Sequence, residues 1–262
     1  MHWKMIYLAR RNPALAPEDF AQAWREHSAL GRQCRNVQDK VLSVTQCARL
    51  LDAVPAGCST DFDGVNLLGL RDRQAANDIW SDAETLAIMR PDEPRVFDRY
   101  VRDFTLVASE QVLRAAPLKG PHEGPNAGAH AGLHGGLHEG PRGDAVLVAF
   151  VRRQAAVSPA DFQQALAQSA SAWADARCVV LNTVEAARPP GYDFDAIVEW
   201  WFASADALRL ALQTQPLRAG AAADLQAGAA APLQTGAAAY LHAVCAMQDT
   251  VFMATGVSHR RP

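Results

Sequence analysis

Two side chains in this sequence are the leading candidates for moving a proton near neutral pH, the imidazole of His27 and the carboxyl group of Glu199. An imidazole titrates near neutral pH, so His27 could act as a general acid, a general base or a metal ligand. Glu199 shares one face of an apolar run with Ile197 and Trp201, where a carboxyl group needs a partner or a proton. The ordinary alternatives are a histidine that ends a helix and a carboxylate bound to an arginine or a turn.

Aromatic side chains could surround such a pair with an apolar pocket for a substrate. The candidates for substrate contact are Tyr7 in the first part of the chain and Tyr192, Trp200 and Trp201 in the second. Aromatic residues on strands and helix faces more often belong to a core, and that alternative stands beside the pocket.

Metal and cofactor chemistry has less support. The five cysteines include no CxxC pair, which is typical of reduced thiols rather than of a disulfide framework. Histidines 130, 134 and 138 have the spacing of helical metal ligands, but the glycines between them oppose a helix. The sequence contains no GxGxxG, P-loop or HExxH motif. We therefore predict no metal site and no cofactor.

Charge and hydrophobicity indicate which kinds of binding partner the protein can have. The formal net charge is −3 and charges of both signs are mixed along the chain, so no basic face is available for nucleic acid. No run of 18 apolar residues occurs and the N-terminus lacks a long apolar segment, which argues against a membrane span or a secretory signal. We expect a cytoplasmic protein that binds a small hydrophobic molecule.

The segments that must position these residues occur twice. Residues 61–65 read DFDGV and residues 193–197 read DFDAI, while APEDFAQAW at 16–24 is matched by SPADFQQAL at 158–166. Because the flanking segments repeat in the same order, we predict an internal duplication. The predicted organisation is a first unit at 1–114, a Gly/Pro/His-rich flexible linker at 115–143, a second unit at 144–255 and a tail at 256–262.

Each unit is predicted to follow the order βαββαβ. The first has strands at 5–10, 41–50, 64–70 and 100–112, with a helix of about three to four turns from Pro17 and a helix at 72–88. The second has strands at 145–151, 177–185, 195–203 and 240–252, with helices at 158–174 and 204–214. The strands are apolar at nearly every position, so both sheet faces should be buried. The expected fold is α+β: two tandem ferredoxin-like units that form a closed, pseudo-two-fold α/β barrel within one chain.

The chain resembles the dimeric α/β-barrel superfamily and, within it, the EthD-like proteins. The resemblance rests on RRNPALAPEDF at 10–20, on Trp24-x-x-His27 and on DAIVEWWF at 195–202. It implies a pseudo-dimer within one chain, which could itself form a homodimer, and it adds Trp24 to the substrate-binding candidates. Members of the superfamily include monooxygenases, lactone isomerases, polyketide cyclases, dehydratases and haem-binding enzymes.

The two units depart from the family pattern in complementary ways. The first has Leu67 at the position of the strand carboxylate, whereas the second has Leu166 and Ser169 at the positions of Trp24 and His27. Two incomplete half-sites are therefore expected, with the chemistry on the side of the second unit's carboxylate.

The leading functional hypothesis is an enzyme that acts by acid/base proton transfer on a small hydrophobic or aromatic molecule. Its reaction would be of the isomerase, dehydratase, cyclase or lyase type, in a degradation or secondary-metabolite pathway. One alternative is a non-catalytic small-molecule-binding accessory protein. The other is a haem-binding monooxygenase with His27 as the axial ligand.

Overall fold

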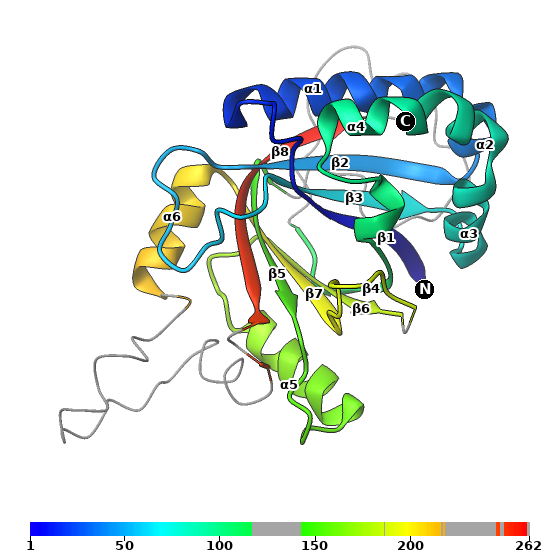
Figure 1. Cartoon of the computed structure of the whole chain (residues 1–262). Coiled ribbons are helices and arrows are strands. Elements are labelled where there is room, and N and C mark those ends of the chain that lie inside the picture. The colour runs from blue at the N-terminus through cyan, green and yellow to red at the C-terminus, as the bar shows by residue number, and fades with distance from the viewer. Residues whose placement is uncertain (117–142, 186, 216, 218–244, 247–248, 261–262) are drawn as a thin grey trace, which may run out of the picture.

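The computed structural model describes residues 1–116, 143–185, 187–215, 217, 245–246 and 249–260. Eight antiparallel strands form a closed barrel in the order β1-β3-β2-β8-β5-β7-β6-β4 (Figure 1). The strands of the first half are β1 (His2–Ala9), β2 (Val41–Arg49), β3 (Gly64–Leu70) and β4 (Thr105–Arg114). Those of the second half are β5 (Ala145–Val151), β6 (Cys178–Val184), β7 (Ala196–Phe202) and β8 (Val251–Arg260).

Helices cover the outside of the barrel. They are α1 (Pro17–Leu30), α2 (Arg35–Gln38), α3 (Arg73–Ser81), α4 (Glu93–Val96), α5 (Pro159–Ser171) and α6 (Ala205–Thr214). Figure 1 shows α1 and α4 lying across β2 and β3. Helix α1 begins with a proline and carries acidic residues in its first turn, which suits the positive end of a helix. None of the described helices combines the length and the hydrophobicity that crossing a membrane requires.

Each strand separates two environments because successive side chains point to opposite faces. In β1 and β3, Ile6 and Leu67 are register partners that face the barrel interior, and Tyr7 and Asn66 are register partners on the outer face, under the helices. In the second half every residue of β5 and β7 is buried, as the apolar sequences of these strands predict. The closed α/β barrel expected from the sequence is present.

Two expected elements of the first half differ in the structure. The predicted helix at 72–88 ends at Ser81 and is followed by a π-helix at Thr85–Met89. The side chain of Asp82 accepts a hydrogen bond from the backbone N–H of Thr85 at 2.8 Å, so it caps a new turn instead of continuing the old one. The strand expected at 100–112 begins at Thr105, after a 3₁₀ turn over Val101–Phe104.

The last strand is the largest correction. It runs from Val251 to Arg260 instead of over 240–252, most of which lies outside the described residues. The reason is that β8 has two partners: its first part pairs with β5 and its last part, residues 255–260, pairs with β2. Residues 256–260, expected as part of the tail at 256–262, therefore belong to the barrel wall. Nearly all of the predicted linker, residues 117–142, lies outside the described part of the chain.

The repeated DFD motif anchors the turn after the first strand of each half. In the first half the carboxylate of Asp63 accepts hydrogen bonds from the backbone N–H of Arg11 at 2.9 Å and from its guanidinium at 3.0 Å. In the second half the carboxylate of Asp195 accepts from the backbone N–H of Arg153 at 2.7 Å. The motif thus has a structural role in both halves, which explains why the pentapeptide repeats.

Replacing Asp63 with alanine should lower the free energy of unfolding by about 1.5 to 3 kcal/mol, the range for hydrogen bonds to a charged group. The change removes the acceptor for the backbone N–H of Arg11 and the counter-charge for Arg11 and Arg49. Urea unfolding measures it. Asp61→Ala is the matched control, because Asp61 belongs to the same motif and is exposed, and it should change stability by less than about 0.5 kcal/mol. Equal losses in the two variants would contradict the anchoring role.

Candidate functional site

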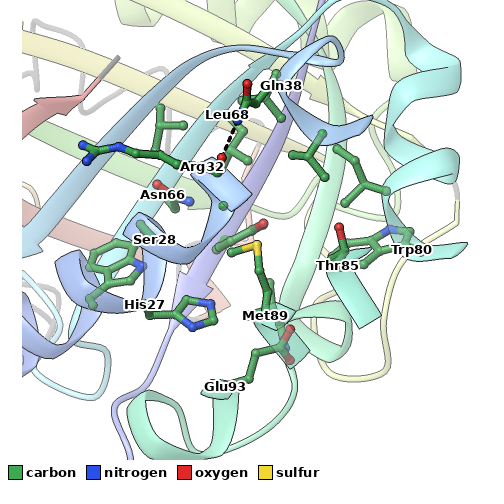
Figure 2. Close-up of a pocket in the computed structure, with 18 residues that line it drawn as sticks. His27, Ser28, Arg32, Gln38, Asn66, Leu68, Trp80, Thr85, Met89 and Glu93 are labelled. Carbon is green, nitrogen blue, oxygen red and sulfur yellow. Dashed lines mark hydrogen bonds between the residues drawn. The ribbon is translucent and has the colours of Figure 1, made fainter. Parts of the chain in front are cut away.

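A cavity of about 100 Å³ lies between the outer face of the first-half strands and the helices above them (Figure 2). Strands β1, β2 and β3 supply its floor and helix α1 supplies one wall. The π-helix and α4 supply the opposite wall. The lining includes Tyr7, Val44, Asn66 and Leu68 from the strands, Trp24, His27 and Ser28 from α1, and Trp80, Thr85, Met89 and Glu93 from the segments that follow β3.

Trp24 can reach the sheet because β3 begins with a glycine. A Cβ atom on Gly64 would lie 2.6 Å from the indole ring of Trp24, so any larger residue there would displace the ring. In the second half the matching positions hold Ala196 and Leu166, a larger strand residue with a smaller helix residue. Trp24 is 1% exposed and forms one side of the cavity.

His27 lies in the last turn of α1 and is 4% exposed. Its Nδ1 atom is 3.0 Å from the carboxylate of Asp92, and the guanidinium of Arg95 donates to both oxygens of that carboxylate, at 2.7 and 3.0 Å. The bonds from Arg95 are the main reason why the pKa of Asp92 is lowered. The ionised carboxylate can only accept, so Nδ1 of His27 carries the hydrogen and Nε2 is left as an acceptor. Burial lowers the pKa of His27, which keeps the ring neutral near pH 7.

Glu93 follows Asp92 in the chain and faces the same cavity (Figure 2). One oxygen of its carboxyl group accepts a hydrogen bond from the backbone N–H of Val101 at 2.8 Å. Burial raises the pKa of Glu93, which favours the protonated acid. Burial, and secondarily the charge of Glu93, raise the pKa of Tyr7, so the phenol on the cavity floor keeps its proton.

The cavity therefore combines a neutral imidazole with a carboxyl group that holds its proton more tightly than usual. Figure 2 shows His27 and Glu93 directed into one space from α1 and α4. Burial thus moves the pKa of His27 down and that of Glu93 up, which favours a neutral base and a protonated acid in the same range of pH. His27 suits the role of base and Glu93 that of acid.

The π-helix adds an adaptable wall. Thr85 and Met89 both line the cavity, and the thioether of Met89 lies close to Gly31 at the end of α1. Isolated π-turns occur frequently at functional sites, and methionine is the flexible apolar side chain that adjusts to an irregular ligand. The cavity can thus enlarge at Met89 without moving the sheet.

Glu199 lies elsewhere, on the inner face of the barrel. It is 0% exposed, and its carboxylate accepts hydrogen bonds from Lys4 at 2.6 Å, from Asn182 at 2.8 Å and from the indole of Trp201 at 2.9 Å. Lys4 also forms an ion pair with Glu110. His27 packs on the outside of the wall and Glu199 faces the inside, so the structure does not bring the two predicted acid/base residues together.

The predicted aromatic residues divide in the same way. Tyr7 and Trp24 line the cavity beside His27. Tyr192 is buried and its hydroxyl lies 3.4 Å from the carbonyl oxygen of Leu8, while Trp200 donates to the carbonyl of Ala170 at 3.0 Å under α5. Trp201 points into the barrel toward Glu199. None of these three second-half residues lines the cavity.

The matching space in the second half is filled. Leu166 and Ser169 of α5 are both 0% exposed, and Trp200 beneath the helix stacks against Trp173 with ring centroids 5.3 Å apart. The structure thus places the cavity in the half that keeps Trp24 and His27.

Sequence reasoning missed Asn66 and Glu93. Asn66 did carry a signal, since it is a polar residue inside the otherwise apolar run VNLLGL and is 3% exposed in the structure. Glu93 gave no comparable signal, because it stands in a charged segment, RPDEPR, that is typical of a surface turn.

No model of a known protein family matches the sequence, and no curated protein matches it. Solved structures do. An anthrone oxidase-like protein aligns with a TM-score of 0.57 and 14% identity over 99% of this chain and 93% of that one. A proposed monooxygenase from Fusobacterium nucleatum aligns with a TM-score of 0.53 and 8% identity over 99% of this chain and 94% of its own. Both have the dimeric α/β-barrel fold, and at these identities the likeness shows the fold alone.

Proposed function

We propose that this protein is an enzyme that moves a proton on a small hydrophobic or aromatic molecule held in the first-half cavity. The observation that carries the proposal is the chain from Arg95 through Asp92 to His27, which fixes the hydrogen on Nδ1 and leaves Nε2 as an acceptor in the cavity. A third group that orients a buried histidine is the arrangement that general bases require.

Each polar group has a role in such a step. Nε2 of His27 takes a proton from a carbon next to a carbonyl group, and the hydroxyl of Tyr7 donates to the oxygen on which negative charge develops. The carboxyl group of Glu93 returns a proton at a second position, so the molecule is isomerised with no net gain or loss of protons. Trp24, Leu68 and Met89 supply apolar surface that excludes water.

The origin of the chain is part of the proposal. We infer an EthD-like ancestor whose gene was duplicated, so that two ferredoxin-like units came to form one barrel. The strand orders β4-β1-β3-β2 and β8-β5-β7-β6 support this history, because each is the same permutation of four consecutive strands. The paired anchors Arg11–Asp63 and Arg153–Asp195 support it as well. In this history the helix of the second half lost the equivalents of Trp24 and His27, and larger strand residues filled the space that the cavity had occupied.

The cavity residues do not fit a haem. Nε2 of His27 could serve as an axial ligand, but an engineered cavity that holds one benzene molecule has about 150 Å³, so this cavity of about 100 Å³ admits even a single ring only when the Met89 side chain moves aside. A tetrapyrrole is several times larger, and room for it would require α1 to separate from the sheet.

Deuterium exchange tests the proposal. Small cyclic ketones and enones would be incubated with the protein in D₂O, and exchange at carbons next to the carbonyl would be followed by NMR. Exchange above the buffer rate is expected for ketones that also shift the resonances of Tyr7 and His27. Binding without exchange would leave the non-catalytic accessory protein as the function, and neither binding nor exchange across the panel would overturn the proposal.

A further inference from the structure

One residue of the cavity floor is destabilising for the fold as it stands. Asn66 lies in the middle of β3 and is 3% exposed, yet its Oδ1 atom has no hydrogen-bond donor within the described part of the chain. No hydrogen bond joins its amide nitrogen to another described residue either. A buried polar group without a partner is rare in folded proteins and calls for an explanation, such as a ligand that supplies the missing bond.

A second unpaired acceptor lies next to it. Gln46 of β2 is the register partner of Asn66 and is 3% exposed. Its amide nitrogen donates to the hydroxyl of Ser28 at 2.7 Å and to the carbonyl of Trp24 at 3.3 Å, which fixes the orientation of the amide. Its Oε1 atom has no donor among the residues that the structure describes. Two amide oxygens on neighbouring strands therefore both lack a hydrogen, and of the two residues Asn66 is the one that lines the cavity.

The remaining polar atoms of the cavity point to the same kind of ligand. Nε2 of His27 is an acceptor because Nδ1 carries the hydrogen, and Glu93 adds a carboxyl group. The cation among the lining residues is Arg32, whose side chain is exposed at the rim. A charged group inside the cavity would have no buried counter-charge among these lining residues, whereas a neutral hydroxyl can donate to the acceptors and can also accept from the protonated Tyr7 and Glu93.

The second half shows that the fold does not need an asparagine here. Val198 holds the matching position, since Ala149 and Val198 are register partners in β5 and β7 just as Tyr7 and Asn66 are in β1 and β3. Val198 is 0% exposed. The same architecture thus accepts an apolar residue at this point of the strand, which favours a ligand-binding reason for Asn66 over a structural one.

We infer that Asn66 selects ligands that donate a hydrogen bond, so that the molecule bound in the cavity carries a hydroxyl group on an apolar ring, as a phenol does. Because no described residue forms a hydrogen bond with either end of the Asn66 amide, the amide can turn its Oδ1 atom toward the ligand and accept the hydroxyl hydrogen, while the ring packs against Leu68 and Met89. The inference rests on the proposed function for its site and adds the chemical class of the ligand. It also makes Asn66 a specificity-determining residue.

Phenol and anisole test this directly, because they differ in the hydroxyl hydrogen that a methyl group replaces. In NMR titrations the wild-type protein should bind phenol about tenfold more tightly than anisole, the effect of one neutral hydrogen bond. Asn66→Leu should bind the two equally. An unchanged preference for phenol in Asn66→Leu, or no preference in the wild type, would overturn the inference and leave a water molecule as the partner of Asn66. If neither phenol nor anisole binds the wild-type protein, the inference about Asn66 also fails.

A thermal readout keeps the test independent of ligand affinity. Asn66→Leu should raise the Tm, because it removes an unpaired buried acceptor. Asn182→Leu is the matched control: the Oδ1 atom of Asn182 also lacks a donor among the described residues, but its amide nitrogen donates to Glu199 and to the carbonyl of Ile197, so its replacement should lower the Tm. A fall in Tm for both variants would show that Asn66 is structural. Absence of deuterium exchange would remove the proposed proton transfer without changing either result.

Discussion

Lys4→Met is expected to lower the free energy of unfolding by about 3 to 5 kcal/mol, the cost of removing one partner from a buried ion pair. The ammonium group of Lys4 lies 2.6 Å from Glu199 and also contacts Glu110, and the three side chains are 8%, 0% and 7% exposed. The substitution leaves two carboxylates in the barrel interior without this counter-charge. Urea unfolding followed by tryptophan fluorescence measures the loss.

Two further variants define the cause. Lys40→Met removes a half-buried lysine outside the barrel interior whose ammonium group donates to a backbone carbonyl, and it should change stability by less than about 0.5 kcal/mol. Adding Glu199→Leu to Lys4→Met should recover part of the loss, because the first half already holds Leu67 at the matching position. If the double variant is less stable than Lys4→Met alone, the charge of Glu199 is balanced by other groups and the explanation fails.

His27→Gln should lower the rate of deuterium exchange by about 10² to 10⁴, the contribution expected of a general base. Glutamine fills much of the space of the ring and leaves no basic nitrogen, so the fold should persist. His2→Gln is the control, since His2 is exposed at the start of β1 and its loss should leave the rate unchanged. Exchange that survives in His27→Gln but is lost in Glu199→Gln would move the chemistry to the barrel interior.

The same proton transfer predicts how the rate of deuterium exchange changes with pH. The base must be neutral, so the rate should rise with pH through the pKa of His27, which burial lowers from its usual 6.5. The acid must be protonated, so the rate should fall as pH rises through the pKa of Glu93, which burial raises from its usual 4.5. The hydrogen bond to Asp92 and, secondarily, the charge of Asp92 raise the pKa of His27, so Asp92→Asn, which removes the charge and weakens the bond, should move the rising limb to lower pH. A rising limb that stays in place in Asp92→Asn would separate the histidine from the reaction.

Most of the barrel was predictable because its signals are local. The strand at 145–151 needed only an unbroken apolar run, and the start of α1 needed only Pro17 with acidic residues after it. The last strand was misplaced because its position depends on two partners, β5 and β2, that are distant in the sequence. A local pattern cannot show which of several apolar segments closes a barrel.

The site was predicted only in part, because local spacing is visible in a sequence and contacts between distant residues are not. His27 and Trp24 lie in one helix, and their spacing marks them as a pair, but the group that orients His27 is 65 residues away in a short charged segment. Strand alternation predicted the face that Glu199 shares with Ile197 and Trp201, whereas its partner Lys4 lies 195 residues away on a strand of the other half. The type of each residue indicates which chemistry it can perform, but only the closed barrel determines which residues lie within contact distance of one another.

The double pairing of β8 has a consequence for synthesis on the ribosome. Strands β2 and β4 are the outer strands of the first half, and their open edges pair with β8 and β6. While the second half is still being translated, both edges and the apolar inner face of the first sheet are unprotected, and exposed strand edges template pairing between chains. The β2 edge is covered only after residues 255–260 have left the ribosome. The first half therefore keeps an open strand edge until its last partner strand has been translated, and during that interval the edge is available for pairing with another chain.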